Sequence, residues 1–181
     1  MDFKIKPHTF KFRTGDTDEI GGCSFIGGSW VDKTTDDLFK GKRILLFSLP
    51  GAFTPTCSNE QLPRFEELAT EFAKYGINNI YCVSVNDAFV MNAWAENQGI
   101  QNVTMLPDGS GEFTEALGML VKKDNLGFGE RSWRYALVAD SGHVEMFFPE
   151  EGYCDNCPTD PYEVSKPDNV WRALKESFFS A

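Results

Sequence analysis

Cys57 stands directly after a turn rich in proline, and this turn follows a run of apolar residues. Pro55 disfavours the helical conformation at Thr54 and suits the first position of a helix, which predicts Thr54 as N-cap and Cys57 as the third helical residue. At that position the backbone N–H groups lack partners and the helix dipole is positive, so a thiolate is favoured over a thiol. Cys57 is therefore a candidate nucleophile.

Thr54 is the second residue of this turn with a use in chemistry. Because a hydroxyl both donates and accepts hydrogen bonds, Thr54 can accept from an N–H at the helix start while it donates to the sulfur or to a bound oxygen atom. The alternative is that Cys57 is an inert buried cysteine behind a strand, as isolated cysteines often are. The flanking turn, in which Pro50 and Pro55 stand on either side of Thr54, favours the reactive interpretation.

The other cysteines have less informative surroundings; they are Cys23, Cys82, Cys154 and Cys157. Cys154 and Cys157 have CxxC spacing, yet they stand in a segment rich in Pro and Asp rather than at a helix start, which argues against a thioredoxin-like redox motif. Cys82 lies within a run of apolar residues and is interpreted as a small core residue.

A zinc site is the alternative that does not require an enzyme. It would combine the CxxC pair with Cys23 and with His8 or His143. The pair supplies only two of the four ligands of a tetrahedral site, and the other residues stand far away in the sequence. We therefore do not predict a zinc site at these residues.

Apolar patterns predict the elements that position these residues. A nearly continuous apolar run at 43–49 predicts a central strand buried on both faces. Helical spacing at 58–75 predicts an amphipathic helix with a kink at Pro63 and an end at Gly76. Further strands are predicted at 80–85, 103–106, 133–139 and 143–148, and further helices at about 88–97, at 112–119 and from Ser165 onward.

Three of these predictions are more detailed. Asp87 is expected to cap the helix that follows it, and Ser165 is expected to cap the last helix, with Pro167 in its first turn. The apolar face of the last helix should include Val170, Leu174 and Phe178. The glycine-rich segment 14–29 is expected to form an irregular surface segment.

The order of elements, a βαβ unit followed by a ββα unit, predicts the fold. It argues for a three-layer α/β sandwich with a mixed central sheet, in a single domain over residues 1–181. Ligands of such folds bind at the carboxyl ends of parallel strands. Cys57 follows such an end.

Composition excludes several classes of function. The 181 residues carry 27 acidic against 17 basic side chains, a net charge of -10, which disfavours binding to nucleic acid or to anionic membranes. No stretch approaches the ~20 apolar residues of a membrane span, and the first residues lack a secretory signal. The odd and sparse set of 5 cysteines fits a reducing compartment, so we expect a cytoplasmic protein.

The pattern P-x-x-x-T-x-x-C, here Pro50, Thr54 and Cys57, resembles the active-site motif of the peroxiredoxins. The longer string around it and the segment 84–90 are similar to the peroxiredoxin 5 branch. Segments 126–135 and 160–165 also resemble bacterial hybrids in which a glutaredoxin domain follows the peroxiredoxin part, a domain that is not expected here. The resemblance implies a thioredoxin-like fold.

The resemblance also implies an arginine that faces the thiolate. Arg134 is at the matching position in a predicted strand, whereas Arg131 is expected in the preceding loop as a surface charge. Arg134 would stabilise both the thiolate and the bound substrate, and Pro50 would pack over the sulfur. The implied reaction is reduction of hydrogen peroxide and alkyl hydroperoxides through a sulfenic acid on Cys57, and it requires neither a metal nor an organic cofactor.

The route by which the sulfenic acid is reduced stays open. Either glutathione or glutaredoxin reduces it directly, or a resolving cysteine forms a disulfide that thioredoxin reduces. Candidates for that cysteine are Cys157, Cys154 and, with less weight, Cys23. The resemblance further implies a homodimer.

A different class of function fits the same motif. A redox-sensing or interaction module with a thioredoxin-like fold would use Cys57 to form mixed disulfides with a partner protein. Rapid consumption of peroxide with small thiols alone distinguishes the enzyme from the module.

Overall fold

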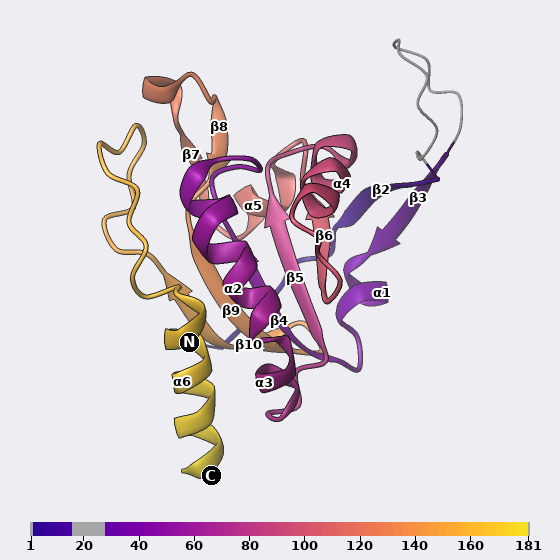
Figure 1. Ribbon diagram of the computed structural model, residues 1–181, viewed down its shortest axis with the longest axis vertical. Coiled ribbons are helices and arrows are strands. Elements are labelled where there is room, and N and C mark those ends of the chain that lie inside the picture. Colours follow the sequence, from indigo (N-terminus) through magenta and orange to yellow (C-terminus); the bar gives the residue numbers. More distant parts are fainter. Residues whose placement is uncertain (1, 16–27, 181) are drawn as a thin grey trace.

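A six-stranded mixed sheet forms the centre of the molecule (Figure 1). The structure is a computed structural model that describes residues 2–15 and 28–180. Strands run in the order β1-β10-β9-β4-β5-β6, with β4, β5 and β6 parallel and the other pairings antiparallel. Their bounds are β1 Phe3–Lys4, β4 Arg43–Ser48, β5 Asn79–Ser84, β6 Val103–Pro107, β9 Tyr135–Asp140 and β10 His143–Pro149. The predicted mixed sheet with a central strand at 43–49 is confirmed.

Alternation along the strands divides the core into two layers of side chains. On one face, Leu45 and Phe47 of β4 pack with helices α2 (Leu62–Glu67), α3 (Ala69–Ala73), α4 (Ala88–Asn97) and α6 (Pro167–Phe179). On the other face, Ile44 and Leu46 pack with α1 (Thr35–Phe39) and α5 (Glu112–Ala116). Because successive side chains of a strand point to opposite faces, one buried strand serves both layers. The predicted three-layer sandwich is confirmed.

Two small sheets flank the central one. In one of them, β2 (Thr9–Thr14) pairs with β3 (Ser29–Thr34). In the other, β7 (Leu120–Lys122) pairs with β8 (Glu130–Ser132), and the short helix η2 (Asp124–Leu126) lies in the segment that connects the two strands. Most of the glycine-rich segment predicted to be irregular lies outside the described residues, as does Cys23. No helix within the described ranges is long and apolar enough to cross a membrane.

The helix predicted at 58–75 is divided into three pieces. A π-helical turn η1 (Cys57–Gln61) precedes α2, and a break at Leu68 separates α2 from α3. Pro63 has no N–H for the helix ladder, and the wide turn in front of it lets Leu62 donate to the Cys57 carbonyl instead. The predicted kink thus appears as a wider turn that begins at Cys57.

Helix ends agree with the predictions only in part. Asp87 caps α4 as predicted, because its carboxylate accepts from the Val90 N–H at 2.9 Å. The prediction of Ser165 as N-cap is wrong, since Pro167 is the first residue of α6 and Lys166 takes the cap position. Helix α5 ends at Ala116 rather than at 119, close to Gly118, whose φ of 73° is left-handed.

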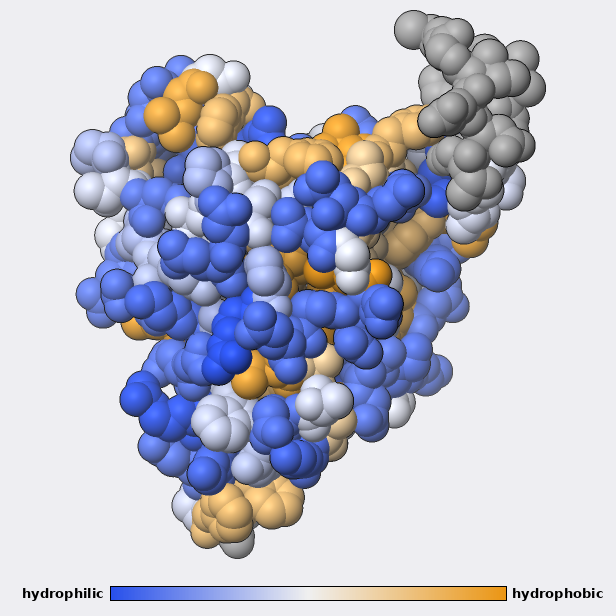
Figure 2. All heavy atoms as spheres, viewed as in Figure 1, coloured by the Kyte–Doolittle hydropathy of each residue, from blue (hydrophilic) through white to orange (hydrophobic). Residues whose placement is uncertain are grey.

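The last helix buries Val170 and Leu174 of its predicted apolar face, whereas Phe178, expected on the same face, is 58% exposed. The helix extends beyond the edge of the packed layer, and the Phe178 ring contacts the rings of Tyr75 and Phe179, with centroids 5.5 Å and 5.7 Å away. Figure 2 shows apolar surface at the lower end of the molecule, where α6 ends in Figure 1.

Candidate functional site

Cys57 lies behind the carboxyl end of β4, at the start of the helical segment. Pro55 and Thr56 are already helical, so Cys57 is the third helical residue, as predicted. The Ser58 N–H donates to the Thr54 carbonyl at 2.9 Å and closes this first turn. The Cys57 side chain is only 1% exposed. The sequence therefore places this sulfur in a closed pocket at a helix start.

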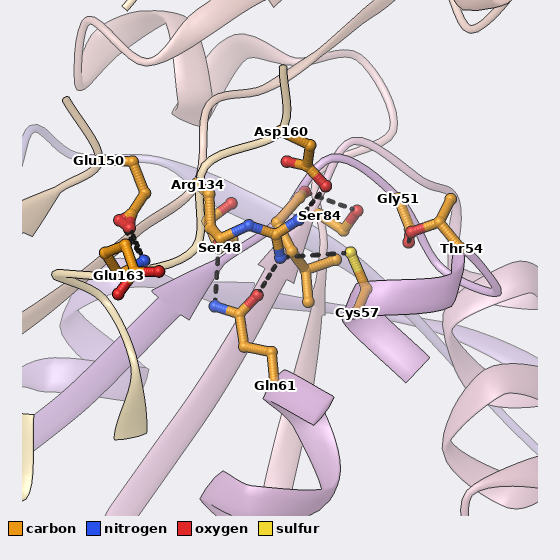
Figure 3. A network of polar contacts seen from close by, with 11 residues as sticks. Ser48, Gly51, Thr54, Cys57, Gln61, Ser84, Arg134, Glu150, Asp160 and Glu163 are labelled. Atoms are coloured by element: carbon orange, nitrogen blue, oxygen red, sulfur yellow. Dashed lines mark hydrogen bonds and ion pairs between the residues drawn. The ribbon is translucent and has the colours of Figure 1, made fainter. Parts of the chain in front are cut away.

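Arg134 brings a positive charge to that sulfur (Figure 3). Its Nη1 atom lies 3.5 Å from Cys57 Sγ and also donates to Gln61 Oε1, while Nη2 donates to Asp160 at 2.7 Å. The guanidinium carbon lies 5.4 Å from the ring centroid of Tyr162. Arg134 is 1% exposed, so its charge is directed to these neighbours rather than to water.

The charge of Arg134 is secured by its partners. Burial opposes the charge, but the Cys57 sulfur and the Asp160 carboxylate outweigh burial and raise the pKa of the guanidinium above its ordinary value. Within the described part of the chain, its Nε atom is buried without a hydrogen-bond partner. The site therefore holds a permanent cation beside the sulfur, and the Nε atom of this cation keeps an unused donor.

The two arginines of this region stand differently from the prediction. Arg131 was expected in a loop but lies in β8, and Arg134 was expected in a strand but lies just before β9. The reason is that β8 pairs with β7 in a separate small sheet, and residues 133 and 134 connect that sheet to the central one. Arg134 still reaches the sulfur, because this connection passes over the carboxyl end of β4.

Gln61 was not identified from the sequence. It is completely buried and connects the arginine to the sheet, because its Nε2 donates to the Ser48 carbonyl at 3.4 Å. Ser48 itself is held by hydrogen bonds to the Val83 carbonyl and to Ser132. The position of Gln61, four residues after Cys57 on the same helical segment, was the available signal.

Asp160 and Tyr162 were also missed as members of the site. Both lie between β10 and α6 in a segment without periodicity, more than 20 residues beyond Arg134 in the sequence. An acidic residue in such a segment is usually a solvated surface charge, and Asp160 is indeed partly exposed. No sequence signal distinguished it from the neighbouring acidic residues.

Thr54 does not cap the helix with its side chain. Its hydroxyl donates to the Gly51 carbonyl at 2.7 Å and thereby holds the turn in front of Cys57 closed (Figure 3). The predicted bond from a helix-start N–H to this hydroxyl is absent from the described residues, because the hydroxyl is turned back toward the loop. Because its proton is engaged with Gly51, this hydroxyl can still accept a hydrogen bond through its lone pairs.

The turn before Cys57 is held from two sides. Arg131 Nη1 lies 3.5 Å from the Pro50 carbonyl oxygen, and a Cβ added to Gly51 would lie 2.9 Å from this nitrogen, so a larger residue at 51 would displace the Arg131 side chain. On the other side, the Ala52 N–H donates to Asn86 Oδ1 at 3.0 Å. Pro50 is buried beneath this turn. These contacts fix the backbone that carries the predicted motif.

Phe53 marks the rim of the pocket. Its side chain is 52% exposed, and its backbone has a φ of 61°, which is unusual for a residue other than glycine. The exposed ring gives the turn in front of Cys57 an apolar outer surface.

The remaining described cysteines lie in contrasting surroundings. Cys82, in the middle of β5, is completely buried, and burial together with the charge of Cys57 raises the pKa of its thiol well above the ordinary value. Cys154 and Cys157 are half-buried in the segment that also carries Asp160. All of these thiols are free. Among the residues that the structure describes, no cluster of three or more metal-ligating side chains occurs.

The arrangement suits attack by sulfur on a small polar molecule. A buried thiol and a fixed cation at 3.5 Å form a site in which negative charge that develops next to the sulfur is stabilised. Reactions that release an anionic oxygen draw the largest benefit from this geometry.

Known proteins resemble the chain over nearly its whole length. The Redoxin family model matches residues 29–155. A peroxiredoxin of Rhizobium etli is 59% identical over 179 residues, 99% of this chain and 98% of that protein. The hybrid peroxiredoxin hyPrx5 of Haemophilus influenzae is 50% identical over 171 residues; they cover 94% of this chain but 64% of that protein. Reduced Prx3 of Vibrio vulnificus, solved in complex with hydrogen peroxide, has a TM-score of 0.81 at 35% identity, covering 97% of this chain and 96% of that one.

Proposed function

The chain belongs to the peroxiredoxin family, and from this premise we propose that Cys57 reduces hydrogen peroxide and alkyl hydroperoxides. The thiol peroxidase activity follows from the family, and the roles of individual residues are supported by the site. The observation that carries the proposal is the distance of 3.5 Å between Cys57 Sγ and Arg134 Nη1 in a pocket closed to water.

The reaction uses the pocket in one step. The Cys57 thiolate forms a bond to one peroxide oxygen while the O–O bond breaks, and the second oxygen leaves with the electron pair. Arg134 stabilises that negative charge until a proton converts the leaving oxygen to water or an alcohol. Thr54 contributes when its hydroxyl donates to a peroxide oxygen instead of to the Gly51 carbonyl. Pro50 shields the sulfur.

The burial of the sulfur supports small peroxides as substrates. Cys57 and Arg134 are each 1% exposed, so a large molecule has no open path to the sulfur. The similar Vibrio vulnificus protein was solved with hydrogen peroxide. The exposed ring of Phe53 offers apolar surface at the rim for the alkyl part of an organic hydroperoxide.

Glutathione with glutaredoxin is the favoured reductant in this proposal, and thioredoxin is the alternative. One support is the similarity to a hybrid peroxiredoxin. The other is the burial of Cys82, which keeps this thiol in the core and away from a role as resolving cysteine. A route through Cys154 or Cys157 would instead require a disulfide between Cys57 and the loop.

The assembly and the compartment belong to the same proposal. We expect a homodimer in a reducing cytoplasm, with the exposed Phe53 close to the interface. Sedimentation at several protein concentrations tests the stoichiometry, and a monomer at every concentration would contradict it.

The decisive experiment compares Cys57→Ser with Cys82→Ala. Reduced protein receives one equivalent of hydrogen peroxide, dimedone traps sulfenic acid, and mass spectrometry locates the label. We expect a label on Cys57 in the wild type and in Cys82→Ala, and no peroxide consumption by Cys57→Ser. Peroxide turnover by Cys57→Ser would refute the proposal.

A second measurement addresses the reductant and the alternative of a redox-sensing module. Peroxide consumption is followed with glutathione alone, with glutathione and glutaredoxin, and with thioredoxin. Turnover with small thiols alone supports the enzyme, whereas a single oxidation that only a partner protein reverses supports the module.

A further inference from the structure

The loop between β10 and α6 holds a second pair of thiols outside the peroxide pocket. Cys154 and Cys157 are the ends of a four-residue turn with Asp155 and Asn156 at its centre. A turn brings its end Cα atoms within about 7 Å of each other, and disulfides bridge Cα atoms about 4.4–6.8 Å apart. The backbone therefore already has a spacing that a disulfide can use.

The turn is fixed to the neighbouring small sheet. The Asn156 N–H donates to the Lys122 carbonyl at 2.7 Å, and the Lys122 N–H donates to Asp155 Oδ1 at 2.8 Å. The Asn125 N–H donates to Asn156 Oδ1 at 3.1 Å. Asn156 has a left-handed φ of 51°, a conformation that asparagine tolerates. These bonds hold both cysteines in place before any bond forms between them.

The base of the loop is held as well. The buried carboxylate of Glu150 accepts from the backbone N–H groups of Glu163, Val164 and Ser165 (Figure 3). Asp160 binds Arg134 from the same loop. The loop therefore has anchors at both ends and at its tip, which lowers the entropy that closing a disulfide would cost.

The two thiols differ in character. The hydrogen bond from Cys154, with help from Thr159 at 3.6 Å, lowers the pKa of the Cys157 thiol, while the same bond to Cys157 raises the pKa of Cys154. The positive charge of Lys123 favours the thiolate at both positions. Both side chains are half-buried, unlike Cys57 and Cys82, so a reagent larger than peroxide can reach them.

We propose that Cys154 and Cys157 are a second redox site, which closes to an intraloop disulfide by exchange with disulfides of low molecular weight such as oxidised glutathione. The Cys157 thiolate attacks the disulfide and releases one thiolate; Cys154 then loses its proton and attacks the mixed disulfide at Cys157, releasing the second thiol. Two electrons pass from the cysteine pair to the incoming disulfide, which leaves as two thiols. The site requires no contribution from Cys57 and so goes beyond the proposed peroxidase.

The experiment uses the full chain with Cys57→Ser, which removes peroxide chemistry but not the loop. The protein is equilibrated in glutathione buffers of increasing oxidised fraction, quenched with an alkylating reagent and analysed by mass spectrometry. We expect Cys154 and Cys157 to lose alkylation together, with a peptide two hydrogen atoms lighter and no bound glutathione. The matched control Cys57→Ser/Cys154→Ser should instead keep glutathione on Cys157.

Each other outcome overturns the proposal. Stable glutathione adducts on either cysteine of Cys57→Ser, or two free thiols in every buffer, would show that the pair does not close. A disulfide between Cys57 and the loop in the wild type, without an intraloop disulfide in Cys57→Ser, would make the loop a resolving site instead. Because no arm depends on peroxide turnover, failure of this proposal is separate from failure of the peroxidase.

Discussion

Cys57 and Cys82 are equally buried, at 1% and 0% exposure, and belong to the same hydrophobic cluster, yet their polar surroundings differ. Cys57 stands at a helix start with Arg134 at 3.5 Å, while Cys82 lies in the middle of β5 among apolar side chains. Burial and the charge of Cys57 raise the pKa of the Cys82 thiol well above its ordinary value.

The comparison shows that burial alone does not make a cysteine inert or reactive. Removal from water penalises a thiolate unless a fixed positive charge and free N–H groups replace the lost solvation. The helical segment and Arg134 supply both at Cys57, and the strand supplies neither at Cys82. The difference between the two sites can be tested by substitutions that remove the positive charge near Cys57 or alter its partners.

Removal of the cation should have the largest effect. In Arg134→Met, we expect the rate of Cys57 oxidation by hydrogen peroxide to fall by about 10²–10³-fold, the cost of losing one preorganised donor to a developing oxyanion. Stopped-flow measurement of the reduced protein tests this expectation. The control Arg172→Met removes an exposed arginine of α6 and should retain the rate; an unchanged rate in Arg134→Met would refute the comparison.

The two cysteines should also differ in alkylation. In the native protein, we expect iodoacetamide to label Cys57 at least about 100-fold faster than Cys82, since only thiolates react and Cys82 is held as a thiol. Quantitative mass spectrometry at several times gives both rates, and unfolded protein serves as the reference in which the rates converge. Equal rates in the folded protein would mean that burial alone controls reactivity.

A smaller effect is expected from the partner of the cation. Asp160→Asn keeps the shape of the side chain but removes the charge that holds Arg134 Nη2, and we expect the rate of Cys57 oxidation to change by about three- to tenfold because this pair is partly exposed. Glu151→Gln, on an exposed residue of the same loop, is the matched control for net charge. Identical effects of both substitutions would argue against a specific role of Asp160.

The smallest effect on chemistry is expected at Cys82. Cys82→Ala should lower the free energy of unfolding by about 1 kcal/mol, because it deletes one buried atom from the core, and should leave the oxidation rate of Cys57 within about twofold. Urea unfolding and stopped-flow oxidation measure the two quantities on the same samples. A large loss of rate would show that the core behind β5 contributes to the pocket.

Local patterns in the sequence were sufficient for the sheet and for the start of the reactive helix. The apolar run at 43–49 predicted a strand, and Pro55 predicted a helix in which Cys57 is the third residue. Both patterns extend over a few residues only, and both predictions hold in the structure. The resemblance around Pro50 and Cys57 further directed attention to Arg134, which does contact the sulfur.

Features that depend on distant contacts could not be predicted. Asp160 reaches Arg134 only because the Glu150 carboxylate holds the base of its loop, and no periodic pattern encodes that contact. Gln61 faces the arginine because the turn before Pro63 is π-helical rather than kinked. The exchange of strand and loop positions between Arg131 and Arg134 followed from a separate small sheet whose strands are only three residues long.

The left-handed backbone of Phe53 has a consequence for the evolution of the chain. A residue other than glycine in this conformation costs on the order of 1–3 kcal/mol of folding free energy. Selection for stability alone would replace it with glycine, which adopts this conformation without strain. A chain that keeps an exposed ring there gives up stability in exchange for the shape of its pocket rim, so variants selected for heat resistance should change this position early and lose affinity for organic hydroperoxides first.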